Sequence, residues 1–481
     1  MNTNTFKSLI LNAAVLLAAT LLLSCCRNSS PISQYGWSDE VRTALNDFIG
    51  IYGNPEQPEY VVFDFDNTCC IYDVSEQLVV YQLETMSFAL GPEQFYDAVR
   101  VGLEGCRPLT EERTERAALL YASLYDRYGP FTYEGLPDGM LEALHNDSEW
   151  QQFADLMGGT YHLLAREHAI ENPYMWAMGW FAGMSSSELY ELFVRSDRYY
   201  AAVPTRERSW GQFSWTDGLR VTDNIRELWK ALDQSGIDVW VCSASSIEAV
   251  MASIDEYGLH QYCTGAIGMT LSKDENGLFD GGYDYQTGYA RLAGADGSWT
   301  ECDIATGVQT KGPGKVTAIE RCLRPRYEGR GPLAAFGDSS GDFNFMTEFA
   351  SLKLAVLFNR AELDVTDGGA LLAETALYQR DVLGYDLSSA NAAGDIYYVL
   401  QGRDVNGLRS LYPSDSTVLL GMGSPRLFRS MHSSVMLDSF VRDSLSVKQI
   451  LEKYCIRTPA SESAFGFAYG WLDAYDGYRC R

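Results

Sequence analysis

The sequence is poor in positive charge. It carries 37 Lys and Arg against 64 Asp and Glu in 481 residues, so its formal net charge is -27 at pH 7. Nucleic-acid-binding proteins need a basic surface that neutralises the phosphate backbone, and this composition therefore argues against DNA or RNA as a partner. A site for an anionic substrate must instead build its positive potential locally, from a metal ion, a lysine or oriented backbone amides.

Patterns typical of zinc sites are also missing. The five histidines show no ligand spacing and none of the 11 cysteines forms a C-x-x-C pair, so a structural zinc site is not expected. Cys455 and Cys480 are a plausible disulfide pair, although the sequence does not determine connectivity. Hydrophobic residues make up 46% of the chain, which is long enough for two or three globular domains.

The first 24 residues predict a signal peptide. An apolar run at residues 9–23 is short for a membrane-spanning helix and suits a signal peptide. Residues 22–25, L-L-S-C, resemble the lipobox of bacterial lipoproteins. The resemblance implies cleavage before Cys25, lipid on its sulfur, and a membrane anchor in the cell envelope facing the periplasm or the cell surface. Cleavage before Cys26, with lipid on that cysteine, is a second possibility. An ordinary secreted protein and an uncleaved membrane anchor are the alternatives to a lipoprotein.

Short apolar runs typical of buried parallel strands alternate with segments of helical periodicity. The helical segments cover residues 224–234, 247–257 and 314–323. This alternation predicts a doubly wound, Rossmann-like α/β fold with a parallel sheet. The predicted strands are residues 60–64, 237–242, 332–336, 352–357 and 396–400.

About 170 residues separate the first two of these strands, and helical periodicity dominates them. We therefore expect a mostly helical cap inserted after the first strand. Within the later sequence, residues 263–308 predict a hairpin with long loops and residues 433–454 predict one helix of a small C-terminal extension. The predicted units are a signal peptide at 1–24, a tether and N-terminal helix at 25–58, a catalytic core at 59–73 and 215–410, a helical cap domain at 74–214, and a C-terminal extension at 411–481. Predicted cap helices cover residues 76–88, 92–103, 111–128, 148–168 and 186–194.

The most informative segment is residues 62–68, V-F-D-F-D-N-T. Asp64 and Asp66 stand two residues apart at the end of a buried strand, where two like charges destabilise each other unless a cation lies between them. Mg²⁺ with oxygen ligands is the usual cation beside a phosphate. One carboxylate can attack phosphorus while the other protonates the leaving oxygen and later activates water. Taken alone, the segment could also be a calcium loop or a turn with an Asx cap.

Two further elements suit a phosphate site. Ser243 ends the second predicted strand just before a helix, where its hydroxyl and the helix amides can bind phosphate oxygens. Ser243 or Ser245 could instead be a plain helix N-cap. Lys315 opens the third helix, a position where a lysine suits phosphate as a point charge, with Lys311 as the other candidate and a solvated lysine as the alternative.

A second pair of acids follows the third predicted strand. Asp338 is placed to ligate a metal, and Asp342 could hold a metal-bound water or orient Lys315. A Gly-Asp turn that caps a helix is the alternative. All these elements fall at the carboxyl edge of the predicted sheet, and together they indicate a phosphoryl-transfer site.

The order D-x-D-x-T, Ser, Lys and G-D-x-x-x-D resembles the phosphatase branch of the haloacid dehalogenase superfamily. The resemblance covers about residues 59–73 and 215–410. It implies Asp64 as the nucleophile that becomes phosphorylated and Asp66 as the general acid and base. The implied Mg²⁺ ligands are the Asp64 carboxylate, the Asp66 carbonyl and Asp338, with Asp342 joining the metal site. Ser243 and Lys315 would bind the phosphoryl group.

A narrower resemblance concerns the substrate. The pattern from Asp64 to residues 73–76, D-V-S-E, and the later residues 400–404, L-Q-G-R-D, are similar to exported phosphorylcholine phosphatases and their phosphoserine phosphatase relatives. The resemblance implies that Asp73 faces the substrate's ammonium group. Arg403 could point toward the site, with a surface salt bridge as the more conservative interpretation. An aromatic cluster could cage a quaternary ammonium or simply form the cap core; its members are Tyr174, Trp176, Trp180, Phe181, Trp210 and Trp215.

These features predict an envelope-anchored enzyme that hydrolyses a small phosphomonoester with Mg²⁺. A phosphotransferase or mutase of the same superfamily differs only in the group that receives the phosphoryl group. A catalytically inactive, lipid-anchored binding protein is the alternative from another class, and the complete set of acids, serine and lysine argues against it.

Overall fold

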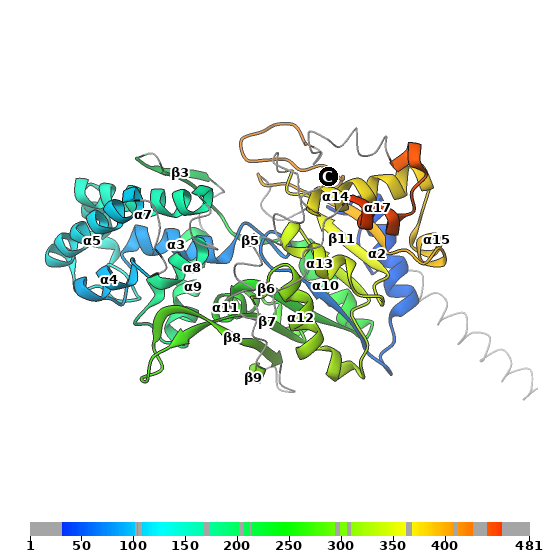
Figure 1. The fold of residues 1–481 in the computed structure, drawn as a ribbon, viewed down its shortest axis with the longest axis horizontal. Helices are drawn as coiled ribbons and strands as arrows, with labels where there is room; N and C mark the ends of the chain where they lie inside the picture. The colour runs from blue at the N-terminus through cyan, green and yellow to red at the C-terminus, as the bar shows by residue number, and fades with distance from the viewer. Residues whose placement is uncertain are drawn as a thin grey trace, which may run out of the picture.

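The computed structural model describes residues 31–101, 103, 108–167, 173–201, 206–211, 213–293, 299–304, 309–361, 368–406, 411–426 and 440–454. One part of the molecule is a sheet covered by helices, and a group of helices from α3 to α9 extends from it (Figure 1). The predicted lipobox and the predicted disulfide pair lie outside the described residues. Across those ranges the structure contains no helix with both the length and the apolar character needed to span a bilayer.

The central sheet has nine strands in the order β13-β12-β11-β10-β1-β6-β7-β8-β9. Its parallel strands are β1 (Glu59–Phe63), β6 (Ile237–Ser246), β7 (Gly265–Lys273), β10 (Ala334–Gly337), β11 (Leu354–Phe358) and β12 (Tyr397–Arg403). The antiparallel edges are β8 (Phe279–Ala293), β9 (Trp299–Ile304) and β13 (Leu411–Tyr412). The predicted doubly wound α/β fold is confirmed. The strand order reverses between β1 and β10, and in such sheets ligands bind at the carboxyl ends of the strands at this switch point.

Burial on both faces explains why the core strands are continuous apolar runs. Val61 and Phe63 of β1 face one hydrophobic core, whereas Tyr60 and Val62 face the other, because successive side chains of a strand point to opposite faces. Helices on the first face are α2 (Asp39–Tyr52), α10 (Asp223–Gln234), α11 (Ile247–Glu256) and α15 (Leu387–Ala392). Helices on the second face are α12 (Pro313–Cys322), α13 (Phe343–Thr347), α14 (Gly368–Tyr378) and α17 (Val447–Tyr454).

The insertion after β1 is mostly helical, as predicted. The expected helices are present as α3 (Val74–Thr85), α4 (Pro92–Ala98), α5 (Pro108–Tyr128), α7 (Ser148–Glu167) and α9 (Ser186–Ala201). The sequence pattern missed α6 (Asp138–His145), α8 (Pro173–Met178) and the hairpin of β3 (Arg206–Trp210) and β4 (Phe213–Asp217). Where the chain leaves and re-enters the core, β2 (Cys70–Ile71) pairs with β5 (Arg220–Val221) and ties the two ends of the insertion together.

The predicted hairpin at residues 263–308 is present, because β8 pairs antiparallel with both β7 and β9. The sequence did not reveal that β7 pairs in parallel with β6, so that these strands extend the central sheet. One prediction about the later sequence is wrong. The predicted helix at 433–454 is broken, because Ser444 adopts a left-handed conformation (φ 48°) and the amide of Leu445 turns back to the carbonyl of Phe440 before α17 begins. The apolar residues on both sides of the turn pack in one hydrophobic core, so the sequence pattern did not reveal the turn. Residues 427–439 lie outside the described part of the chain.

Candidate active site

Asp64 is the first residue after β1, and neighbouring groups fix its carboxylate. Its backbone amide continues the sheet by donating to the carbonyl of Phe336 in β10 at 2.8 Å. The hydroxyl of Thr68 donates to Asp64 Oδ2 at 3.1 Å, and Lys315 Nζ lies 2.5 Å from Oδ1. The D-x-D-x-T motif therefore folds back on itself, so that its threonine orients its first aspartate.

Lys315 is the cation that contacts this carboxylate. Pro313 at the start of α12 follows Gly312, whose positive φ of 54° turns the chain into the helix. Lys315 is 2% exposed, and its Nζ lies 2.6 Å from Asp342 Oδ1 as well as beside Asp64. Burial lowers the pKa of Lys315, but the charges of Asp342 and Asp64 outweigh burial and hold the pKa above its ordinary value. Lys315 is therefore a protonated, immobilised ammonium group.

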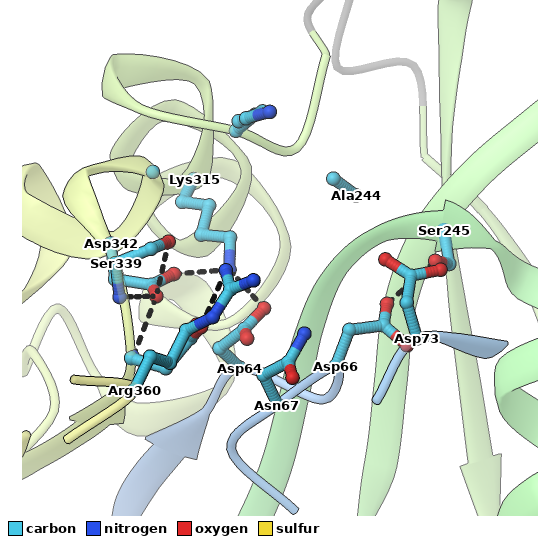
Figure 2. A pocket seen from close by; sticks show the side chains of 13 residues that line it. Asp64, Asp66, Asn67, Asp73, Ala244, Ser245, Lys315, Ser339, Asp342 and Arg360 are labelled. Atoms are coloured by element: carbon cyan, nitrogen blue, oxygen red, sulfur yellow. Dashed lines mark hydrogen bonds and ion pairs between the residues drawn. The ribbon is translucent and has the colours of Figure 1, made fainter. Parts of the chain in front are cut away.

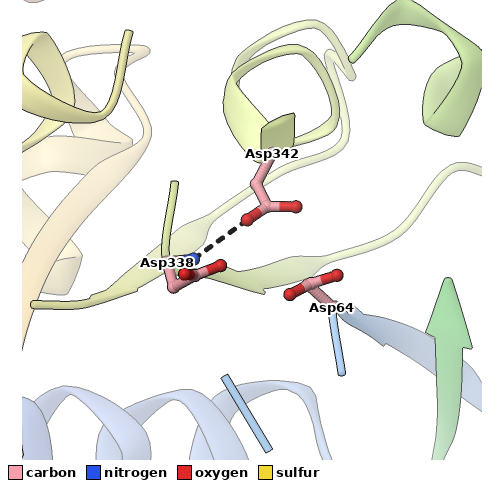
Figure 3. Close-up of side chains that lie close together, drawn as sticks. All are labelled: Asp64, Asp338 and Asp342. Carbon is pink, nitrogen blue, oxygen red and sulfur yellow. Dashed lines mark hydrogen bonds between the residues drawn. The ribbon is translucent and has the colours of Figure 1, made fainter. Parts of the chain in front are cut away.

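Three buried acids meet at the switch point. Carboxylate oxygens of Asp64, Asp338 and Asp342 lie within 4.8 Å of one another (Figure 3). Burial and the charge of Asp342 raise the pKa of Asp64 to about 6, although Lys315 opposes the shift. Burial raises the pKa of Asp338 well above its ordinary value, although Arg360 opposes the shift. Asp342 is the exception: burial alone would raise its pKa, but Lys315 and backbone amides hold it below the ordinary value.

This cluster fits a hard divalent cation. All the side-chain donors are carboxylate oxygens, which Mg²⁺ prefers. In the described part of the chain, the buried Oδ2 of Asp338 accepts no hydrogen bond. Asp342 is already engaged, since its Oδ2 accepts from the amides of Asp338 at 3.0 Å and Ser339 at 3.2 Å. The arrangement points to Asp64 and Asp338 as ligands, with Asp342 holding the loop and Lys315 in place.

The Asp66 carboxylate lies apart from the three clustered acids. Its Oδ1 accepts from the amide of Val74 at 2.8 Å, and its Oδ2 accepts from the hydroxyl of Ser245 at 2.6 Å and that of Ser243 at 3.3 Å. Burial, with the charges of Asp73 and Asp64, raises its pKa well above the ordinary value. Burial therefore favours the protonated form of Asp66, while the hydrogen bonds that its two oxygens accept favour the carboxylate. Metal ligation by its backbone carbonyl stays a prediction, since the cluster is defined by side-chain oxygens.

The serines and Asp73 occupy different places. Ser243 is fully buried and is not among the residues that line the pocket, whereas Ser245 lines it. Neither serine is the N-cap of α11, a position taken by Ser246 because β6 continues to that residue. Asp73 lines the pocket and caps α3, with its Oδ1 accepting from the amides of Ser75 at 2.8 Å and Glu76 at 3.0 Å.

The pocket at the switch point encloses about 100 Å³ and is strongly charged (Figure 2). Both candidate lysines, Lys311 and Lys315, line it, and so does Arg360, which sequence reasoning missed. Arg360 stands two residues beyond β11, so the rule that ligands bind at carboxyl ends of strands could have found it. The remaining lining residues are Asp64, Asp66, Asn67, Asp73, Ala244, Ser245, Asp338, Ser339, Gly341 and Asp342.

Arg403 is not in a surface salt bridge. It is 4% exposed at the carboxyl end of β12, and its Nη1 donates to the carbonyl of Asn67 at 2.6 Å. Asn67 adopts a left-handed conformation (φ 58°) between Asp66 and Thr68. Burial, with the nearby charge of Arg360, lowers the pKa of Arg403 to about 10. The conservative interpretation is wrong because the parallel strand order, which the Q-G-R-D segment does not reveal, brings this arginine to the nucleophile loop.

The described members of the aromatic cluster pack in or against the hydrophobic core, and none of them lines the pocket. Trp176, Trp180 and Phe181 are buried in the hydrophobic core, where the two indoles meet edge to face at 5.1 Å. Trp176 Nε1 donates to the carbonyl of Val99. Trp210 lies at a separate hollow, and no aromatic side chain lines the described pocket. The core interpretation of this cluster is the one the structure supports. The Tyr174 side chain lies outside the described part.

Fold and site together define a doubly wound α/β protein with an acidic, lysine-containing pocket at its switch point. No protein-family model matches the chain, and no curated protein matches it. Among solved structures, a conserved protein of unknown function from Anaerococcus prevotii DSM 20548 is 22% identical, with a TM-score of 0.62 over 82% of this chain and 100% of its own. That likeness shows a shared fold.

Two looser alignments are with a protein of unknown function from Bordetella pertussis Tohama I and with cytosolic 5'-nucleotidase IIIB bound to cytidine. The first is 12% identical, covers 63% of this chain and 90% of its own, and has a TM-score of 0.30. The second is 16% identical, covers 67% and 78%, and has a TM-score of 0.29. At these TM-scores neither alignment carries an argument about this chain.

Proposed function

We propose that this protein is a magnesium-dependent phosphomonoesterase with Asp64 as its nucleophile. The observation that carries the proposal is the position of Asp64, hydrogen-bonded to the buried Lys315 and clustered with Asp338 and Asp342 at the sheet's switch point. The resemblance of these motifs to the phosphatase branch of the haloacid dehalogenase superfamily implies the same chemistry. Asp64 and Asp338 would hold Mg²⁺, which when bound neutralises the carboxylates and the approaching phosphate.

The protein's own groups supply the remaining chemistry. Thr68 and Lys315 hold the Asp64 carboxylate, and the ammonium of Lys315 offers positive charge to phosphoryl oxygens. As an Asp64 oxygen bonds to phosphorus, the bond to the leaving oxygen breaks and Asp66 gives that oxygen its proton. Water then attacks phosphorus, Asp66 takes a proton from it, and the bond from phosphorus to Asp64 breaks. The raised pKa of Asp66 suits a group that begins the cycle protonated.

The direct test is phosphate release from a panel of phosphomonoesters with Mg²⁺ and with EDTA. We expect release with Mg²⁺ and a fall of about 100-fold or more in EDTA, because the clustered acids repel a dianionic substrate once the cation is removed. Transfer to an added alcohol in place of water would favour the phosphotransferase alternative. Tight Mg²⁺ binding without turnover of any substrate would favour the inactive binding protein.

Replacing Asp338 by alanine should raise the Mg²⁺ concentration for half-maximal activity by about 10–100-fold, because a metal ligand is lost. Asp47→Ala is a matched control on the exposed surface of α2. Activity as a function of Mg²⁺ concentration measures the effect for both variants. Equal Mg²⁺ requirements would remove Asp338 from the metal site.

We also propose that the substrate carries an amine, as phosphorylcholine and phosphoserine do. The supporting observation is that Asp73 lines the pocket. Asp73→Asn keeps a good N-cap for α3, since asparagine and aspartate cap helices equally well, and removes only the charge. We expect KM for these two substrates to rise by about 10-fold while KM for glycerol phosphate stays unchanged. Turnover of both amines no faster than glycerol phosphate by the natural protein would exclude an amine substrate.

The place of action is a proposal of its own: a lipoprotein of the cell envelope, held to a membrane through Cys25. The lipobox-like residues 22–25 support it. Incorporation of a labelled fatty acid in a bacterial host, lost in Cys25→Ala, is the expected result. Labelling that persists in that variant and disappears in Cys26→Ala would place the lipid anchor on Cys26.

A further inference from the structure

Arg360 is a cation of the pocket that the mechanism above does not use. Its Nη1 lies 3.2 Å from Asp338 Oδ2, and its side chain is 32% exposed against 4% for Asp338. It also lines the pocket, as Asp64 does (Figure 2). The guanidinium is therefore the positive group next to the carboxylate oxygen that a metal ion would take.

The pairing of Arg360 with Asp338 differs from that of Lys315 with its acids. Lys315 is 2% exposed and donates two short hydrogen bonds, to Asp64 and Asp342. Asp338 Oδ2, in contrast, accepts no hydrogen bond within the described residues, so Arg360 faces it by charge without hydrogen-bond alignment. An unaligned pair with one partly exposed partner is weak and is readily exchanged for a stronger cation.

The backbone around Arg360 is anchored, so an exchange needs only side-chain movement. The amide of Asn359 donates to the carbonyl of Gln401 at 2.8 Å, and the side-chain amide of Asn359 donates to the carbonyl of Asp415 at 2.6 Å. On the other side, the amide of Ala361 donates to Asn359 Oδ1 at 2.8 Å. The long arginine side chain thus extends from a fixed backbone to line a pocket of about 100 Å³.

We propose that Arg360 is a substrate-binding residue that serves as the counter-ion of Asp338 until the metal ion binds. The inference rests on the proposed phosphatase function. Asp338 Oδ2, which Arg360 faces, would then become a metal ligand, and the positive charge held there would repel the guanidinium. A phosphoryl group bound in the same pocket then offers the guanidinium a new anionic partner, and the planar fork of arginine matches its oxygens. Metal binding thereby prepares the pocket for the substrate.

The experiment compares Arg360→Gln and Arg360→Lys with Arg324→Gln, a control on the exposed surface near α12. Calorimetric titration of the metal-free protein with Mg²⁺, without substrate, measures metal affinity. Steady-state kinetics and inhibition by inorganic phosphate measure binding of the phosphoryl group. We expect Arg360→Gln to bind Mg²⁺ about 3–10-fold more tightly, because a competing cation is gone, and to raise KM and the phosphate inhibition constant about 10-fold. Arg360→Lys should lie between the natural protein and Arg360→Gln.

The opposite direction of the two effects separates this role from a structural one. If Arg360 merely held Asp338 in position, Arg360→Gln would weaken Mg²⁺ binding, and that result overturns the inference. Unchanged Mg²⁺ affinity or unchanged KM also overturns it, while the proposed phosphatase survives as long as the natural protein binds Mg²⁺ and releases phosphate. Failure of the natural protein in both assays removes the proposed function itself.

Discussion

Replacing Asp64 by asparagine is expected to reduce phosphate release by about 10⁴-fold or more, because the amide cannot form the phosphorylated intermediate. The fold should persist. Asparagine has nearly the shape of aspartate, its oxygen can still accept from Thr68, and Lys315 keeps Asp342 as its partner. The measurements are phosphate release at saturating Mg²⁺ and a far-ultraviolet circular dichroism spectrum, with Asp47→Asn as the exposed control on α2. Substantial Mg²⁺-dependent activity in Asp64→Asn would exclude Asp64 as the nucleophile.

For the same variant we also expect a change in how the free energy of unfolding depends on pH. In the metal-free protein the pKa of Asp64 is raised from its ordinary 3.8 to about 6, so the folded state binds more protons than the unfolded state between these values. Stability from this group is therefore fully present below about pH 4 and is lost as the pH rises through about 6. In EDTA, the natural protein should lose more free energy of unfolding across this window than Asp64→Asn does. Parallel curves for the two proteins would show that Asp64 titrates normally.

Replacing Lys315 by methionine is the second large effect, and it concerns stability as well as activity. Lys315 is the buried counter-ion of Asp64 and Asp342, at 2.5 and 2.6 Å. Removing it leaves carboxylates buried without compensation, which costs about 3–5 kcal/mol of the free energy of unfolding. Loss of its charge beside the phosphoryl group should also reduce turnover by about 10²–10³-fold.

Magnesium should restore part of the stability that Lys315→Met loses, because a bound cation neutralises the same carboxylates. A ligand at 100 times its dissociation constant stabilises the folded state by about 2.7 kcal/mol. Urea unfolding in EDTA and in excess Mg²⁺ measures both effects, with the exposed Lys230→Met of α10 as the control. If Lys315→Met unfolds at the same urea concentration as Lys230→Met in EDTA, Lys315 is not the counter-ion of these acids.

Much of the fold could be predicted because its signals are local. A strand that is buried on both faces must be apolar, as residues 60–63 of β1 are, so the sequence marks it without reference to its partners. The carboxyl ends of such strands share one edge of the sheet, which is why Asp64, Lys315 and Asp338 could be assigned to one site from their positions alone. The break at Ser444 and the parallel pairing of β7 with β6 lacked such a signal.

The contacts between side chains at the site depend on how distant segments of the chain pack together. Lys315 and Asp64 are separated by 251 residues, and Arg403 and Asn67 by 336, so no local pattern relates them. The sheet order, which places β10 beside β1, brings Asp338 into contact range of Asp64. Local sequence patterns therefore indicate where the chain is extended, where it is buried and which chemical groups stand at the ends of its strands. Which of these groups contact one another is set by the folded arrangement, because each contact joins two distant segments and a local sequence pattern describes only one of them.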